Sequence, residues 1–173
     1  MANVPILNMP VATALDGNEY VPIVQTGTNK RATTGLIAQT FASGVFSGAI
    51  EVVVDGFGYA LNAGLACYLT VPFDCTIQGA TLLGSTSGST SVDIWKCTYA
   101  QFDAGATHPV SGDTICGSTP PTISSATKSS NTTLTGWTTT LSEGDILAFN
   151  VGATTAMTRV TLSVDVARVV SSS

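Results

Sequence analysis

The sequence has little charge and few basic residues. Only 10% of its 173 residues are Asp, Glu, Lys or Arg, against ~25% in ordinary soluble domains. Six basic and eleven acidic residues give a net charge of −5. Lys30-Arg31 is the only adjacent basic pair. A nucleic-acid-binding protein shows a basic patch, so we expect no nucleic-acid partner.

Long hydrophobic runs and a secretory leader are also missing from the sequence. A membrane-spanning helix needs ~18 or more consecutive apolar residues, and no segment offers them. A secretory signal begins with a basic segment before an apolar one, whereas the first basic residue here is Lys30. We therefore expect no membrane insertion, and a chain that is made and kept in a cytoplasm unless lysis releases it.

Residues that hold metals or act as catalytic bases are scarce. His108, followed by Pro109, is the only histidine, which leaves no base near most candidate nucleophiles and no second imidazole for a metal. Zinc sites use cysteines two to four residues apart, a spacing that does not occur here. The cysteines are Cys67, Cys75, Cys97 and Cys116. We expect no metal or cofactor and favour buried thiols, although the spacing does not decide whether any pair forms a disulfide.

The catalytic motifs that can be found are weak. Ser125-Ala126-Thr127-Lys128 matches the S-x-x-K motif of penicillin-recognising enzymes, but the companion motifs S-D-N and K-T-G are missing. We interpret this segment as a polar loop. The carboxylates available for glycoside cleavage are Asp93, Asp103, Asp113 and Asp145. Nothing in their spacing brings two of them to the ~5–9 Å that this reaction requires, so we predict a protein that is not an enzyme.

Neutral polar residues and β-forming residues are abundant. The chain contains 27 Thr and 17 Ser, and its hydrophobic content of 44% is ordinary, which argues against disorder. Strands are predicted at residues 50–54, 65–71, 75–83, 91–99, 134–140, 146–151 and 159–169, with turns at 84–89 and 142–145. In the last strand, Val160, Leu162, Val164 and Val166 alternate with less apolar residues. This pattern predicts an all-β fold, an antiparallel β-sandwich or jelly roll.

The N-terminal quarter of the chain has a different pattern. Prolines lack a donor for sheet pairing and disfavour helix before them, and Pro5, Pro10 and Pro22 all lie here. We predict an extended arm at residues 1–44, with a short strand at 20–25, a turn at 26–29, and one short helix at 35–41 capped by Thr34. The predicted domains are this arm, a β-sandwich domain at 45–170 and a loose tail at 171–173. The arm has too few apolar residues to fold alone and must dock on a partner.

Two parts of the sequence resemble a known class of proteins. Residues 15–25 and 30–38 resemble the N-terminal segment of tailed-bacteriophage fibre and appendage proteins, in which an arm that attaches to the virion precedes a variable domain. Residues 92–96, 134–137 and 141–151 look like a β-rich domain of phage tail-fibre and head-decoration proteins. The resemblance implies a non-enzymatic virion surface protein, a short fibre or capsid decoration, and leaves open whether it attaches to capsid or tail. The arm residues expected to contact other virion proteins are Val21, Ile23, Val24, Arg31 and Ile37.

Composition also predicts self-association. Neutral Thr and Ser faces suit hydrogen-bonded contacts between copies, where burying a charge is costly, and sheet edges need covering. We therefore expect contacts between copies of the chain, and the resemblance implies that the assembly is a homotrimer.

The alternative function is that of an adhesin domain that binds host-surface glycans through residues 100–133, with Trp137 and His108 as the candidate contacts. The candidate aromatic residues for stacking on sugars are Tyr59, Tyr68, Trp95, Tyr99 and Trp137, although packing is the simpler role for Trp95.

Overall fold

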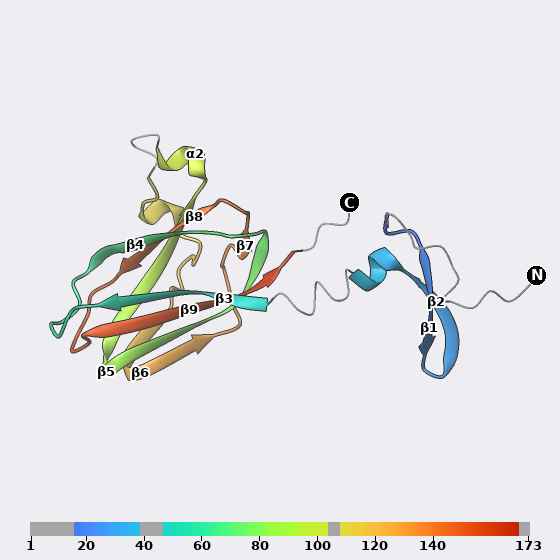
Figure 1. The fold of residues 1–173 in the computed structure, drawn as a ribbon. Helices are drawn as coiled ribbons and strands as arrows, with labels where there is room; N and C mark the ends of the chain where they lie inside the picture. Colours follow the sequence, from blue (N-terminus) through green and yellow to red (C-terminus); the bar gives the residue numbers. More distant parts are fainter. Residues whose placement is uncertain (1–15, 39–46, 104–107, 170–173) are drawn as a thin grey trace, which may run out of the picture. The chain divides into compact units, whose positions relative to one another are not determined.

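The computed structural model describes residues 16–38, 47–103 and 108–169, which fall into two compact units, one within residues 1–45 (unit 1) and one within residues 46–171 (unit 2) (Figure 1). The rest of the predicted arm and the predicted tail at 171–173 lie outside the described residues.

Unit 1 contains a β-hairpin. Strands β1 (Tyr20–Gln25) and β2 (Thr28–Thr33) are antiparallel and pair from Tyr20 with Thr33 to Gln25 with Thr28. The two turn residues, Thr26 and Gly27, have φ angles of 51° and 73°. Positive φ at both positions is the geometry that matches the twist of a tight hairpin. The predicted strand at 20–25 is confirmed. The predicted turn at 26–29 is confirmed only for 26 and 27, because 28 and 29 belong to β2, a strand that was not predicted.

A helical segment at residues 34–38 follows the hairpin directly. The Leu36 N–H donates to Thr33 Oγ1 at 3.1 Å, so Thr33 caps the helix. The prediction of a short helix is confirmed, and the prediction that Thr34 caps it is wrong. Thr34 has another role, because its hydroxyl donates to Glu19 Oε2 at 2.6 Å.

Unit 2 is an antiparallel β-sandwich, as the sequence predicts. Its strands are β3 (Ser47–Asp55), β4 (Gly64–Thr70), β5 (Cys75–Cys97), β6 (Thr122–Asn131), β7 (Thr140–Leu141), β8 (Ile146–Val151) and β9 (Arg159–Arg168). Two short helices, α2 (Tyr99–Phe102) and η3 (Ser111–Asp113), follow β5. The order across the curled sheet is β3-β9-β5-β8-β4, and β6 and β7 also pair with β5.

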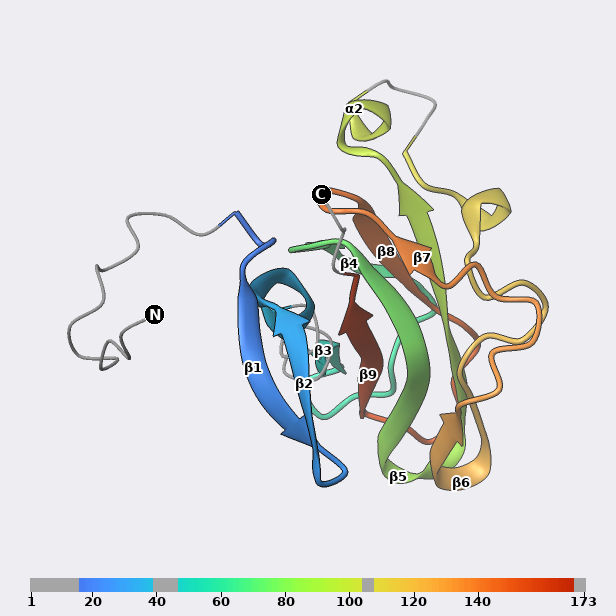
Figure 2. The ribbon, with the colours of Figure 1, turned by 90° about the vertical axis from the view of Figure 1, so that its right-hand side faces the viewer.

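Strand β5 belongs to both layers of the sandwich. Its first half, 75–84, pairs with β9, and its second half, 92–97, pairs with β8 (Figure 2). The predicted turn at 84–89 is therefore wrong. The glycines that suggested it serve close packing, because a Cβ atom on Gly88 would collide with the Thr155 carbonyl oxygen and one on Gly84 would lie 2.8 Å from the Met157 methyl group.

Two other segments differ from the predictions. The S-x-x-K segment, interpreted as a polar loop, lies in β6 and pairs with β5. The strand expected at 134–140 is mostly irregular, with only Thr140–Leu141 in a strand. In β6 only Ile123 is fully buried, so this strand lacks the alternation by which a strand is recognised.

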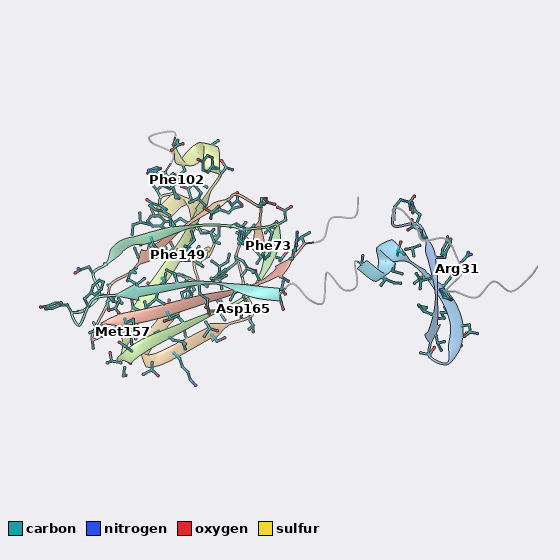
Figure 3. The ribbon with its side chains drawn as sticks, viewed as in Figure 1. Arg31, Phe73, Phe102, Phe149, Met157 and Asp165 are labelled. Carbon is teal, nitrogen blue, oxygen red and sulfur yellow. The ribbon has the colours of Figure 1, made fainter. Side chains whose placement is uncertain are left out.

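The core lies between the two layers. Phe149 of β8 is completely buried at its centre (Figure 3), and the alternating residues of β9, Val160 to Val166, are buried as predicted. The other fully buried large side chains include Leu82, Ile94, Ile123, Leu141, Leu147, Met157 and Leu162. Each buried side chain of this size contributes ~1.5–3 kcal/mol, so this core stabilises unit 2.

The outer face of the β4–β8–β5 layer is also covered. Ile146 and Ala148 of β8 are buried but do not belong to the central core cluster. The chain between β5 and β6 packs on this side, with Phe102 of α2 against Tyr68 of β4 and Pro109 buried. Within the described ranges, no helix has the length and apolar character needed to cross a bilayer.

Candidate functional site

The two ends of unit 2 differ in where the chain enters and leaves. Strand β3 begins at Ser47, which pairs with Ala167 near the end of β9. The chain connections of unit 2, before β3 and after β9, therefore lie at the same end. Strand β3 then runs nine residues to Asp55, a length of about 30 Å at ~3.3 Å per residue. The turn at residues 55–60, called the distal turn below, therefore lies at the end away from the chain connections (Figure 1).

The distal turn exposes two aromatic side chains. Phe57 is 88% exposed and Tyr59 is 80% exposed. Their backbone is held in place, since the Phe57 N–H donates to Asp55 Oδ1 at 2.8 Å and the Tyr59 N–H donates to the Gly56 carbonyl at 3.0 Å. The Asp55 carboxylate also forms an ion pair with Arg159 at 3.6 Å. The rings are thus presented to solvent from an ordered turn.

Unit 1 offers a second candidate surface. Tyr20, Pro22 and Val24 share one face of the hairpin because alternate residues of a strand point the same way. All three are exposed, with Val24 at 72%. Arg31 pairs with Pro22 across the strands, and its guanidinium lies 4.4 Å from the Tyr20 ring centre (Figure 3). This hairpin face combines uncovered apolar side chains with one positive charge.

In unit 1, the Glu19 carboxylate connects the turn before β1 to the start of the helical segment. Glu19 accepts hydrogen bonds from the Asp16 N–H at 2.7 Å, the Gly17 N–H at 3.1 Å and the Thr34 hydroxyl. These bonds, with the Thr34 hydroxyl the largest cause, lower the pKa of Glu19 to about 2. The turn before β1 is thereby tied to the start of the helix while the carboxylate is ionised.

Three rings form a cluster on the outer face of the β4–β8–β5 layer. The Phe102 ring lies edge-on to Tyr68, with centroids 4.9 Å apart, and His108 lies over Phe102 with centroids 4.3 Å apart. The predicted glycan contact His108 is exposed, but one side of its imidazole already faces a ring of the protein.

Trp137, the other predicted glycan contact, is in the core. It is only 9% exposed, and its indole N–H donates to the Thr119 carbonyl at 3.1 Å. The ring packs within the central cluster of buried residues, so a sugar has no free ring face on which to stack. The role predicted for Trp137 is not supported by its position.

The carboxylates singled out in the sequence hold local structure. Asp93 accepts hydrogen bonds from the Ile94 N–H at 2.9 Å, the Trp95 indole N–H at 2.7 Å and the Thr114 hydroxyl at 2.6 Å. Asp113 accepts a bond from the Val110 N–H at 2.9 Å. Both carboxylates therefore fix the covering segment after β5.

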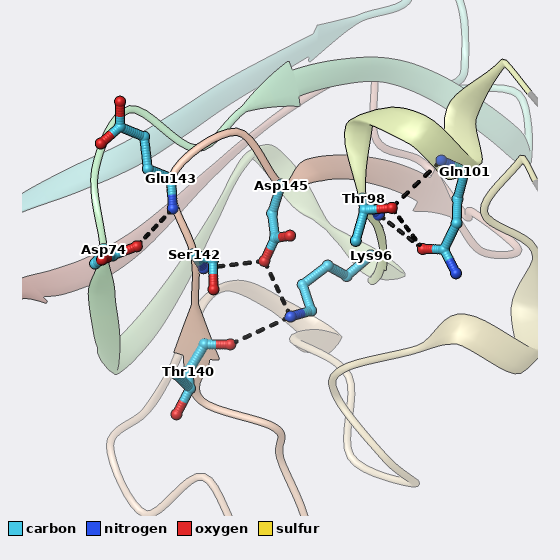
Figure 4. Close-up of polar contacts among 8 residues, drawn as sticks. All are labelled: Asp74, Lys96, Thr98, Gln101, Thr140, Ser142, Glu143 and Asp145. Carbon is cyan, nitrogen blue, oxygen red and sulfur yellow. Dashed lines mark hydrogen bonds and ion pairs between the residues drawn. The ribbon is translucent and has the colours of Figure 1, made fainter.

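Asp145 has a similar structural role at the predicted turn before β8. Its Oδ2 atom lies 3.0 Å from Lys96 Nζ and accepts the Ser142 N–H at 3.0 Å (Figure 4). Lys96 also reaches the Thr140 carbonyl at 3.5 Å, which ties β5 to the approach of β8.

The four cysteines are free thiols, and Cys75, Cys97 and Cys116 are buried. Burial raises the pKa of all four, and it raises that of Cys116 to about 12. The prediction of buried thiols is confirmed for these three, while Cys67 is half-buried. In the described part of the chain, no group of three or more His, Cys, Asp or Glu residues has the arrangement of a metal site.

Comparison with family models, curated proteins and solved structures finds no match to this chain. A functional assignment therefore depends on the chain's own geometry.

The predicted anchoring residues are divided between the two faces of the hairpin and the helix. Val24 and Arg31 are on the open face, whereas Val21 and Ile23 share the other face with the buried Ala32. Ile37 lies in the helix and is half-buried. Sequence reasoning missed Phe57 entirely. The available signal was an aromatic residue between two glycines, directly after the strand-ending pair Asp55-Gly56.

Proposed function

We propose that this chain is a non-enzymatic structural protein of a bacteriophage virion, a homotrimeric surface appendage that is anchored by unit 1. The observation that carries the proposal is the uncovered apolar surface of unit 1. Ala32 is the one buried apolar residue among the described residues of this unit, while Tyr20, Val24 and Leu36 are exposed. Units this small usually need a partner, a metal or a disulfide to be stable, and a virion partner would supply the missing burial.

The anchoring surface is assigned to the open face of the hairpin. Covering a Val or Leu side chain contributes ~1.5–3 kcal/mol, and the Arg31 guanidinium is placed beside the apolar side chains to pair with a carboxylate of the partner. Val24 is at the centre of this role because it is highly exposed and lies on this face.

Self-association is supported by the outer face of the β3–β9–β5 layer. Val53 of β3 and Leu83 of β5 are exposed and pair with Thr161 of β9 from its two sides. Val53, Thr161 and Leu83 thus form a row of apolar and hydroxyl side chains across the layer. Strand β3 is the first strand in the sheet order and is therefore an edge strand. Contact between copies would cover both the row and the edge.

The positions of the candidate catalytic groups favour a structural role over an enzymatic one. His108 packs on a ring, Ser125 lies in β6 with a φ of 48°, and Asp93 holds a local network. A nucleophile needs a base within hydrogen-bond reach, and the structure gives these three residues other contacts.

The test is attachment to particles of the phage that encodes the chain. We expect the full chain to co-sediment with those particles, and Val24→Asp to lose attachment because a charge would replace the apolar contact. Val110→Asp, at an exposed position of unit 2, is the matched control and should still attach. Attachment by Val24→Asp equal to that of the unaltered chain would contradict the proposed anchor. Light scattering tests the trimer separately, since a stable mass of 17.6 kDa would exclude it.

A further inference from the structure

The distal turn presents an unusual combination of ring exposure and backbone order. Phe57 and Tyr59 have the highest exposed fractions among the large apolar side chains of the described residues. Leaving such rings in water is unfavourable. Isolated exposed apolar residues are common, so exposure alone does not define a site.

The backbone conformation of Phe57 is the second observation. Its φ is 54°, a left-handed conformation that a bulky residue rarely adopts and that Asn or Gly adopts readily. Among the described residues, four other non-glycine residues also have positive φ, namely Thr26, Ser125, Leu134 and Ala156, but Phe57 is the one aromatic residue among them, and its side chain is 88% exposed. Strained positions cluster at functional sites, and here an aromatic residue occupies a position whose backbone conformation Asn or Gly adopts more readily.

The turn is held rigid by the neighbouring loop between β8 and β9. The Gly56 N–H donates to the Thr158 carbonyl at 2.7 Å, and the Leu61 N–H donates to the Met157 carbonyl at 2.9 Å. Met157 is completely buried at this end of the sandwich (Figure 3). Because both sides of the turn are fixed to this loop, the backbone that carries the rings is ordered before any ligand arrives, which lowers the entropic cost of binding.

The chemistry around the rings indicates the class of ligand. The adjacent charges, Asp55 and Arg159, pair with each other. Beside the turn, the Ser85 and Thr158 hydroxyls hydrogen-bond to each other at 3.1 Å, and the Thr86 hydroxyl donates to the Ala156 carbonyl at 2.6 Å, so these hydroxyls offer a ligand chiefly their remaining acceptor positions. Aromatic faces stack on the C–H faces of sugar rings, and neutral hydroxyls exchange hydrogen bonds with sugar hydroxyls. An anionic ligand or an anionic membrane would instead require unpaired basic residues, and the chain's net charge is −5.

We propose that Phe57 and Tyr59 form a contact site for neutral saccharides, with the rings stacking on the sugar and the adjacent hydroxyls binding its edges. This site replaces the glycan contact expected at Trp137 and His108. It goes beyond the structural role proposed above and does not depend on how unit 1 is anchored.

The experiment measures binding of the full chain to immobilised dextran, mannan and galactan, with heparin and phosphatidylcholine vesicles as the alternative surfaces. We expect binding to at least one neutral polysaccharide, and a loss of at least tenfold in affinity for Phe57→Asn and for Tyr59→Ser. Tyr99→Ser removes another highly exposed ring, on α2, and should bind within twofold of the unaltered chain.

Thermal unfolding of the same variants separates ligand contact from folding. Because Asn accepts the left-handed conformation, Phe57→Asn should unfold at the same temperature as the unaltered chain or a higher one while losing binding. A marked fall in its unfolding temperature would mean that Phe57 is a structural residue, and would overturn the proposal. No binding to any neutral polysaccharide, binding that survives both substitutions, or binding to heparin or vesicles alone would also overturn it. None of these results bears on particle attachment, which tests the anchor.

Discussion

Asp93→Asn is the substitution that most directly tests how the covering segment is held on the sandwich. The side chain keeps its size, so packing is unchanged, but it loses its charge and one acceptor. In the native chain Oδ1 accepts from the Ile94 N–H and the Thr114 hydroxyl, and Oδ2 accepts from the Trp95 indole N–H. In the variant, the amide nitrogen faces the indole N–H. If the amide turns over, its nitrogen faces the Ile94 N–H, so a donor is left without an acceptor in either orientation.

The expected cost follows from these three bonds. Hydrogen bonds to a charged acceptor contribute ~1.5–3 kcal/mol and neutral ones ~0.5–1.5 kcal/mol. Asp93 is half-buried, so the lower ends of these ranges apply. One lost bond at about 1.5 kcal/mol and two bonds weakened by about 1 kcal/mol each give a loss of about 3.5 kcal/mol in the free energy of unfolding. For a unit of this size, at about 3–5 °C per kcal/mol, the unfolding temperature should fall by roughly 10–18 °C.

Urea unfolding followed by tryptophan fluorescence measures this loss, because Trp95 is itself one of the bonded groups. Asp165→Asn is the matched control: it makes the same chemical change at an exposed position on β9 (Figure 3), and should stay within about 0.5 kcal/mol of the native value. If Asp93→Asn is as stable as this control, the Asp93 bonds do not hold the segment and the reasoning is refuted.

Two further predictions concern pH and thiol chemistry. The lowered pKa of Glu19 (about 2, against 4.5 for the free side chain) means that its contribution to unit 1 is complete above pH 4.5 and is lost as the pH falls toward 2. The amide NMR shift of Gly17, whose N–H donates to Glu19, should report this transition, and its change over the same range should be markedly smaller in Glu19→Gln. The raised thiol pKa values of all four cysteines predict slow reaction with a disulfide reagent at pH 8 in the native chain and rapid reaction of all four after denaturation; fast labelling of Cys116 in the native chain would contradict its burial.

The sequence predicted the fold class and the strands with clear alternation. The prediction for 159–169 succeeded because the inward residues of β9 are all Val or Leu, and the prediction for 146–151 matches β8, which is apolar because both of its faces are covered. Alternating apolar residues are therefore sufficient to predict a strand that separates core from solvent, as β9 does, and a short continuous apolar run is sufficient to predict a strand that is covered on both faces, as β8 is.

The prediction failed where small residues have a tertiary role. The segment from Gly84 to Ser89 looks like a turn, because Gly and Ser are common in turns, yet it continues β5 through a bend around the β8–β9 loop. The use of these glycines depends on Thr155 and Met157, some seventy residues away in the chain, and no local pattern shows that contact. The prediction for the segment that forms β6 failed for a related reason. This strand pairs only with β5 and has few inward-facing apolar residues, so its sequence shows no alternation.

The candidate sites were harder to predict than the fold. Tryptophan is often taken as the marker of a sugar-binding surface, but whether an aromatic ring is buried or exposed depends on contacts such as that of Trp137 with Thr119. Trp137 is buried, whereas Phe57 is exposed to solvent because it lies in the distal turn. The hairpin face of unit 1 was partly predicted, since Val24 and Arg31 were expected there, but the strand β2 that pairs with β1 carries no apolar alternation.

Strand β3 has a mechanical consequence. It receives the polypeptide from unit 1 at Ser47 and ends at the distal turn, so tension between a fixed anchor and a bound ligand would act along this one strand. The strand is already extended and its backbone is continuous between these two points, so its covalent bonds carry the tension. Its nine pairs with β9, from Ser47 to Asp55, lie beside this line of force and are not pulled apart. An attached ligand could therefore be dragged without the sandwich being pulled open.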